Sequence, residues 1–185
     1  MTTIDPNAPS ARHAPMGFAE FLTFCSAGMA INSLAVSIML AALPEIASAY
    51  AMADANRQQM VLPMFFTGFS IGQIGVGMFS DRFGRRATFL FGMVVYCVAT
   101  VACVFAPTFE ILLIARFLAG MASAGPRVVV VSAVRDCYVG RRMASLMSLV
   151  MTVLFVAPIL APTLGHLILL GSNWQVLFGI LLIHG

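Results

Sequence analysis

The feature that most constrains this chain is a series of apolar runs, each about as long as a membrane is thick. A bilayer core of about 30 Å takes about 20 helical residues to cross, so each complete run is long enough to span it. The complete runs cover about residues 16–42, 60–79, 87–105, 109–134 and 143–170. A sixth run, residues 174–185, is about half a span long.

The composition agrees with a membrane protein. The sequence is 61% hydrophobic and 9% charged, whereas an ordinary soluble domain has about 25% charged residues. Helices satisfy their own backbone hydrogen bonds, which lipid requires. We therefore expect an all-α integral membrane protein whose short connections make successive helices antiparallel neighbours. Residues 1–15, which are polar and contain prolines, are expected to form a flexible tail before a helical bundle over residues 16–185.

The arginines fall unevenly on the two sides of the predicted membrane. If the N-terminus is cytoplasmic, most arginines outside the runs lie in cytoplasmic segments, and only Arg57 lies outside. The cytoplasmic set is Arg12, Arg82, Arg85, Arg86, Arg135, Arg141 and Arg142. We therefore expect a multi-pass protein of the cell inner (plasma) membrane. A net charge of +3, scattered among apolar runs, does not indicate nucleic-acid binding.

A short charged segment, residues 77–86, separates the second and third runs. Its charged residues are Asp81, Arg82, Arg85 and Arg86, and its glycines include Gly77 and Gly84. Because ionised groups are costly in hydrocarbon, this segment must lie at a water interface. The two glycines allow the backbone to turn sharply there.

Two further arginines lie inside the fourth run. Arg116 and Arg127 are eleven residues apart, so about 100° per residue brings them to within roughly 20° of the same azimuth, with Gly120 on the same stripe. Arginines on a membrane helix are expected to face a protein interior or a wet cavity. The alternative for both is that they snorkel to the nearer membrane surface. Gln73, in the second run, faces either a substrate or a neighbouring helix.

The fifth run contains Pro158 and Pro162, followed by Gly165 and His166. Prolines in membrane helices free backbone carbonyls and create bend points, so they indicate either a hinge or a static kink. His166 lies near the outer end of this run, where an interfacial role is favoured over a titrating one.

No enzymatic or metal-binding motif is found. The four cysteines lie in or beside apolar runs without a Cys-x-x-Cys pair or a Cys/His cluster, which indicates buried free thiols. The sequence also lacks a nucleophile elbow, a His-Glu-x-x-His motif and a phosphate loop. We expect neither an enzyme nor a bound cofactor.

Three segments resemble motifs of the major facilitator superfamily of transporters. Residues 77–86 match its conserved loop motif in their glycine, aspartate, arginine, glycine and final basic pair. Residues 112–120 resemble its fourth-helix motif, in which an arginine is followed four residues later by a glycine, although Ala119 replaces the customary glutamine. Residues 157–166 are similar to the antiporter motif of drug:proton exporters, with Gly165-His166 in place of a closing glycine pair.

Other runs look like one branch of the superfamily, the bicyclomycin-resistance (Bcr/CflA) multidrug exporters. These runs are residues 43–46, 134–138 and 157–162. Ser37 stands where that branch often has an acidic residue in the first helix, so the proton-coupling residue is left open. The resemblance covers nearly all of residues 17–185.

The resemblance implies a proton-coupled exporter of small amphipathic drugs that works by alternating access between two bundles. This chain would be the N-terminal six-helix bundle with an incomplete sixth helix, and its partners would be the bilayer, the substrate, protons and a C-terminal half.

The implied roles are gating for the residues Gly77, Asp81, Arg82, Gly84, Arg85 and Arg86; proton coupling or cavity electrostatics for Arg116, Gly120, Arg127 and Gln73; and a fifth-helix interface for Pro158, Pro162 and Gly165. The alternatives are a truncated membrane protein that does not transport, and a metabolite or sugar transporter of the same fold.

Overall fold

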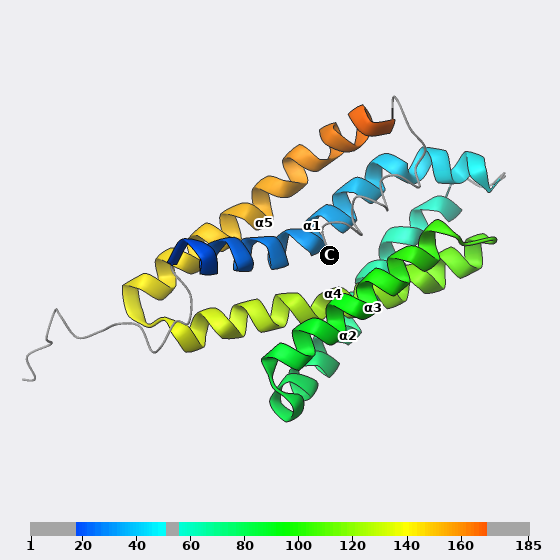
Figure 1. Cartoon of the computed structure of the whole chain (residues 1–185). Helices are drawn as coiled ribbons and strands as arrows, with labels where there is room; N and C mark the ends of the chain where they lie inside the picture. The colour runs from blue at the N-terminus through cyan, green and yellow to red at the C-terminus, as the bar shows by residue number, and fades with distance from the viewer. Residues whose placement is uncertain (1–17, 51–55, 170–185) are drawn as a thin grey trace, which may run out of the picture.

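The structure, a computed structural model, describes residues 18–50 and 56–169 (Figure 1). The described residues form α-helices and one short 3₁₀ helix, so the all-α fold is confirmed. The elements are α1 (Phe18–Ala49), η1 (Arg57–Met60), α2 (Val61–Phe83), α3 (Arg85–Val104), α4 (Phe109–Cys137) and α5 (Gly140–Leu169). The expected tail over residues 1–15 and the sixth run over residues 174–185 lie outside the described residues.

Three helical segments among the described residues are long and apolar enough to cross a membrane. They are Arg57–Phe83, Arg85–Val104 and Phe109–Cys137. The two parts of α1, Glu20–Ser37 and Ala42–Ala49, count as a fourth if the bent pair is one span.

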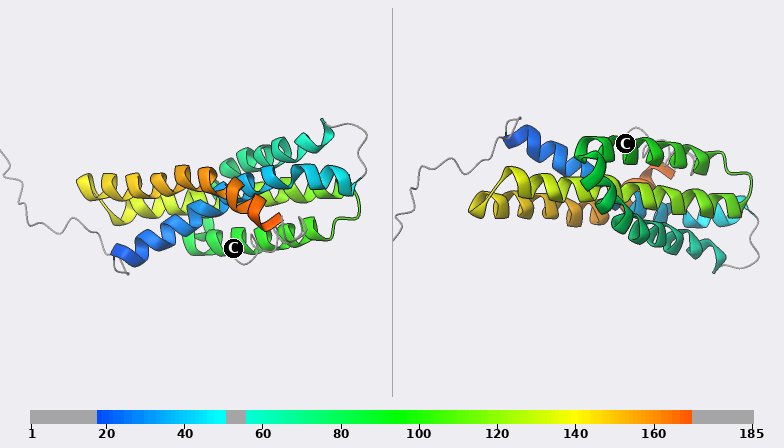
Figure 2. Two further views of the ribbon diagram at one scale, coloured as in Figure 1. Left: turned by 90° about the horizontal axis from the view of Figure 1, so that it is seen from above. Right: turned by 90° about the horizontal axis from the view of Figure 1, so that it is seen from below.

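The central helix of the bundle is α4. Helices α2 and α3 pack along opposite sides of it and contact each other much less, while α1 packs mainly against α5 and secondarily against α4 (Figure 2). The expectation that successive helices are antiparallel neighbours is therefore wrong for α1 with α2, and the pairs α2 with α3 and α4 with α5 contact each other only slightly. Short connections bring the helix ends together, but the fit of the helix surfaces decides which helices pack along their length.

Glycines explain why α2 packs against α4. A Cβ atom added to Gly68 or to Gly120 would lie 2.0 Å from a backbone oxygen of the facing helix, and one at Gly72 would lie 2.4 Å away. These positions leave no room for a side chain, and small residues are what allow membrane helices to approach closely. Gly75 has no neighbouring atom within 4 Å of the same position. Of these α2 glycines, Gly68 and Gly72 therefore serve helix contact, whereas Gly75 does not.

The first helix does not end near Ala42. It continues through Pro44 to Ala49, and the segments on either side of the break are bent by 52°. Proline lacks the N–H that would bond to the carbonyl four residues earlier, and its ring crowds that carbonyl. Pro44 therefore kinks this helix instead of ending it.

The charged segment over residues 77–86 is mostly helical rather than a loop. Helix α2 continues to Phe83, α3 begins at Arg85, and the single residue between them is Gly84 with φ of 83°. The turn from α4 to α5 uses Gly140, with φ of 61°. Glycine adopts positive φ without steric cost, which is why so few residues suffice to reverse the chain.

Two clusters of buried apolar side chains lie at the two ends of α1 and α4. One contains Met39, Phe65 and Leu112, and the other contains Met29 and Val130. The cysteines are free, as expected, although Cys97 and Cys137 are only half-buried whereas Cys25 and Cys103 are fully buried.

Candidate functional site

The end of the bundle that carries the Gly84 and Gly140 turns is rich in arginine, and we call it the arginine-rich end. Its exposed charged residues are Asp81, Arg82, Arg86, Arg135, Asp136 and Arg141, and Arg85 is half-buried. Gly77 lies one turn before the cluster, and a Cβ atom there would have no neighbour within 4 Å. Gly84 makes the turn itself, so the motif over residues 77–86 presents its charges on a sharp helical reversal.

An ion pair connects this reversal to α4. Arg85, at the start of α3, pairs with Asp136, in the last turn of α4. The two side chains are 40% and 54% exposed, so solvent screening limits the stabilisation to about 1 kcal/mol or less. Sequence reasoning noted Asp136 only as part of a family-like run and did not pair it with the charged segment. The Arg135-Asp136 pair at the end of an apolar run was the available signal.

Aromatic rings surround the same reversal on its membrane side. The Phe79 ring lies 4.5 Å from the Phe83 ring and 5.6 Å from the Phe91 ring, centroid to centroid. The Arg82 guanidinium carbon lies 5.6 Å from the Phe83 centroid. These contacts place a positive charge beside apolar rings, as at a membrane–water interface.

Arg116 lies in the interior of the protein. It is 2% exposed, and its charge interacts electrostatically with Tyr96 and Cys103, both on α3. In this structure it does not snorkel to a membrane surface. A buried charge costs several kcal/mol unless polar partners compensate it, so the packing of α3 against α4 is tied to this residue.

Arg127 does not share the buried environment of Arg116. It is half-buried, and its guanidinium carbon lies 5.4 Å from the centroid of the Phe69 ring on α2. Eleven residues of helix separate the two arginines by about 16 Å. The two arginines lie on the same face of α4, but Arg116 interacts with α3 and Arg127 contacts α2.

A layer of hydrogen-bonded polar side chains separates the two apolar clusters. Asn32 Nδ2 on α1 donates to Ser123 Oγ on α4 at 3.4 Å, and Ser123 Oγ donates to the Gly120 carbonyl at 2.7 Å. Ser33 Oγ donates to a backbone carbonyl of α5 at 3.2 Å, and Ser37 is buried nearby in sequence. We call these residues of α1 and α4 the polar layer. Sequence reasoning missed Asn32 and Ser33, although two polar residues within an apolar run were visible.

The remaining candidates lie elsewhere. Gln73 is exposed on α2, whereas Gly120 is enclosed between α2 and α4. The backbone at Pro158, Pro162 and Gly165 belongs to α5, but the side chains at these positions lie outside what the structure describes.

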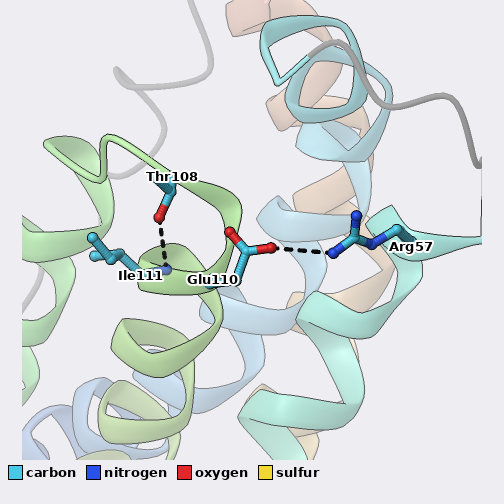
Figure 3. A network of polar contacts seen from close by, with 4 residues as sticks. All are labelled: Arg57, Thr108, Glu110 and Ile111. Carbon is cyan, nitrogen blue, oxygen red and sulfur yellow. Dashed lines mark hydrogen bonds and ion pairs between the residues drawn. The ribbon is translucent and has the colours of Figure 1, made fainter.

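The opposite end of the bundle carries a second ion pair, shown in Figure 3. Arg57 Nη2 lies 3.1 Å from Glu110 Oε1. The Thr108 hydroxyl accepts a hydrogen bond from the Ile111 N–H at 3.4 Å and so caps α4. Both charged side chains are more than half exposed, so this pair links η1 to α4 at a solvent-facing surface.

The chain is similar in sequence to known transporters. The family model described as Major Facilitator Superfamily matches residues 25–184. An uncharacterized MFS-type transporter, YdgK of Bacillus subtilis (strain 168), is 34% identical over 94% of this chain and 44% of its own length. The multidrug resistance protein MdtL of Escherichia coli O81 (strain ED1a) is 32% identical over 90% of this chain and 42% of its own length. MdtL of Klebsiella pneumoniae (strain 342) is 32% identical over 77% of this chain.

The chain spans less than half the length of the curated relatives it matches. The family match nevertheless covers most of the chain, and the three membrane-length helices among the described residues agree with it. The chain is therefore an all-α membrane protein that belongs to the major facilitator superfamily of transporters.

Proposed function

We propose that this chain is the N-terminal bundle of a proton-coupled exporter of small amphipathic drugs that works by alternating access. The observation that carries the proposal is the full burial of Arg116 in a membrane-length helix. An ionisable residue is costly inside a membrane and marks a functional site by default. The printed name of the MdtL relatives supports drugs as the substrate class.

The proposed location is the inner (plasma) membrane, with the N-terminus on the cytoplasmic side. The exposed arginines of the arginine-rich end would then face the cytoplasm, and Arg57 would face the outside. This distribution follows the rule that cytoplasmic segments carry the excess of positive charge.

The arginine-rich end is the proposed gate. Arg85 is held to α4 by Asp136, whereas Asp81, Arg82 and Arg86 are exposed and can contact the C-terminal half of a complete transporter. Alternating access requires two bundles to rock against each other around a central site. Charges on a sharp helical reversal would stabilise one of the two arrangements.

Arg116 is the proposed centre of proton coupling or cavity electrostatics. Ser37, which is 3% exposed, cannot titrate as the acidic residue of the resembling branch would. A fixed guanidinium charge favours the ionised form of any acid brought close to it, so it helps that acid to release a proton. In the complete transporter, Arg116 would act on such a group.

The test is proton-driven efflux of a fluorescent dye from vesicles that contain the complete chain. Arg116→Ala is expected to lower gradient-driven efflux at least about tenfold, because losing a nearby opposite charge shifts the pKa of an acid by about one unit or more. Arg57→Ala removes an exposed arginine at the other end and serves as the control that keeps efflux. If folded Arg116→Ala protein pumps as the parent does, the assignment of Arg116 is wrong. If the parent protein moves no dye against a gradient, the exporter proposal fails.

A further inference from the structure

An apolar groove opens between α2 and α3, and α4 forms its floor. Its volume is about 330 Å³, and its lining includes Phe79, Phe91 and Gly75. The groove exists because α2 and α3 pack mainly against α4 and contact each other much less. The stacked rings of Phe79 and Phe91, 5.6 Å apart between centroids, bridge its end near Gly84. Figure 2 shows the two helices on either side of α4. A Cβ atom at Gly75 would meet nothing within 4 Å, so the space beside this glycine is open.

The groove has the length and direction of a lipid chain in one leaflet. Along α2 its lining runs from Phe79 to Ile71, which lie about 8 and 20 Å from Gly84 at 1.5 Å per residue. One leaflet contributes about 15 Å of a 30 Å hydrocarbon core. The groove therefore begins close to the arginine-rich end and continues into the membrane, parallel to an acyl chain.

The end of the groove near the turn is positively charged. Arg82 and Arg86 flank the Gly84 turn and are exposed, as is the one acidic residue of the turn, Asp81. Arg85 is engaged by Asp136, so the exposed charges Asp81, Arg82 and Arg86 leave a positive balance. The first turn of α3 has no acidic residue, and Gly84 offers no side-chain cap. Its backbone N–H groups therefore add to the preference of this surface for an anion.

We propose that this groove binds an anionic phospholipid, with an acyl chain between α2 and α3 and the phosphate beside Arg82 and Arg86. Charge complementarity favours this occupant over a helix, because a helix filling an apolar groove needs no basic residues at its mouth, whereas basic pockets between membrane helices suit acidic lipid head groups. The α3 side chains Val94 and Val98 are also exposed and apolar, as expected of a surface that faces lipid.

The test is native mass spectrometry of the complete protein, titrated separately with dioleoyl phosphatidylglycerol, dioleoyl phosphatidylcholine and inorganic phosphate. Phosphatidylglycerol is expected to be retained more strongly than phosphatidylcholine. Arg82→Gln combined with Arg86→Gln is expected to weaken its retention about 25-fold, since each arginine contributes about a fivefold factor. Arg141→Gln removes an exposed arginine from the same end, on α5, and is expected to change retention little.

A second pair of variants tests the acyl-chain part of the site. Gly75→Leu fills the groove and is expected to weaken retention of both lipids, whereas Ile74→Phe adds bulk to the neighbouring residue, which is 73% exposed and outside the groove lining. Thermal unfolding checks that both variants fold.

Three outcomes would overturn the proposal. The first is that Arg141→Gln weakens retention as much as the double variant, and the second is that phosphate alone competes as well as lipid. The third is that Gly75→Leu unfolds the complete protein while Ile74→Phe does not, because a helix of the same protein would then fill the groove. Lipid retention is measured without transport, so failure here is distinguishable from failure of the exporter proposal.

Discussion

The contact between α2 and α4 and the contact of α1 with its neighbours are built in different ways. Along α2 and α4, glycines place backbone against backbone, and a single added Cβ atom would collide with a carbonyl oxygen. Along α1, apolar side chains fill the space and Asn32 and Ser33 hydrogen-bond to α4 and α5. Lipid tails are as apolar as the helices, so neither contact has a hydrophobic driving force of the kind found in water.

The difference indicates which helix contacts in the bundle can adjust and which cannot. A backbone contact depends on shape, and its geometry is lost if the helices separate. A side-chain contact can repack, and its hydrogen bonds contribute modestly because a separated membrane helix also finds partners. We therefore expect α2 and α4 to behave as one rigid unit, and α1 to be the more adjustable partner.

The largest effect is expected from filling the backbone contact. Gly120→Leu would place a branched side chain where the Phe65 carbonyl oxygen lies, which should destabilise the bundle by about 3 kcal/mol or more because overpacked helices must move apart. Chemical denaturation in detergent micelles measures the change. Gly75→Leu is the matched control, since the same addition there meets open space. Equal losses for the two variants would show that shape complementarity does not distinguish these positions.

Much of this fold could be predicted from the apolar runs, because helix formation in lipid depends on length and hydropathy. Helix ends were harder. The first apolar run was expected to end at about residue 42, yet α1 passes through Pro44 with a bend, because a membrane helix can satisfy the freed carbonyl in other ways. Which helices pack against each other could not be predicted from the sequence either. Only the folded bundle shows that α4, rather than α3, is the main partner of α2.

The candidate site likewise has features that residue chemistry predicts and features that depend on how the helices pack. The charged reversal around Gly84 could be predicted because ionised residues must reach water wherever the helices lie. The azimuth of Arg116 left two possibilities, and packing against α3 decided between them. Asp136 could not be assigned to Arg85 in advance, because their contact depends on how the ends of α3 and α4 meet.

A smaller effect is expected from the polar layer. Asn32→Ala should destabilise the bundle by about 0.6 kcal/mol, the average for hydrogen bonds between membrane helices. Ser123→Ala should cost more, because its hydroxyl also bonds to the Gly120 carbonyl. A double-mutant cycle on the two residues isolates the contact between α1 and α4. A coupling energy as large as the loss in Gly120→Leu would show that α1 is held as rigidly as α2.

The smallest effects are expected at the two ion pairs that bracket the bundle. Replacing Arg85 by Gln should lower the free energy of unfolding by about 0.5 kcal/mol, because exposed pairs are screened by solvent. Replacing Arg57 by Gln should lower it by less. Arg57 and Glu110 are 56% and 65% exposed, compared with 40% and 54% for Arg85 and Asp136. Raising the salt concentration to about 1 M shortens the screening length to about 3 Å and should remove most of both contributions.

Thermal unfolding of each single and double variant at low and high salt measures the two coupling energies. A coupling at Arg85 that survives high salt would mean that the charged reversal is anchored to α4 more firmly than an exposed ion pair allows, and that the rigid unit of α2 and α4 also includes the start of α3.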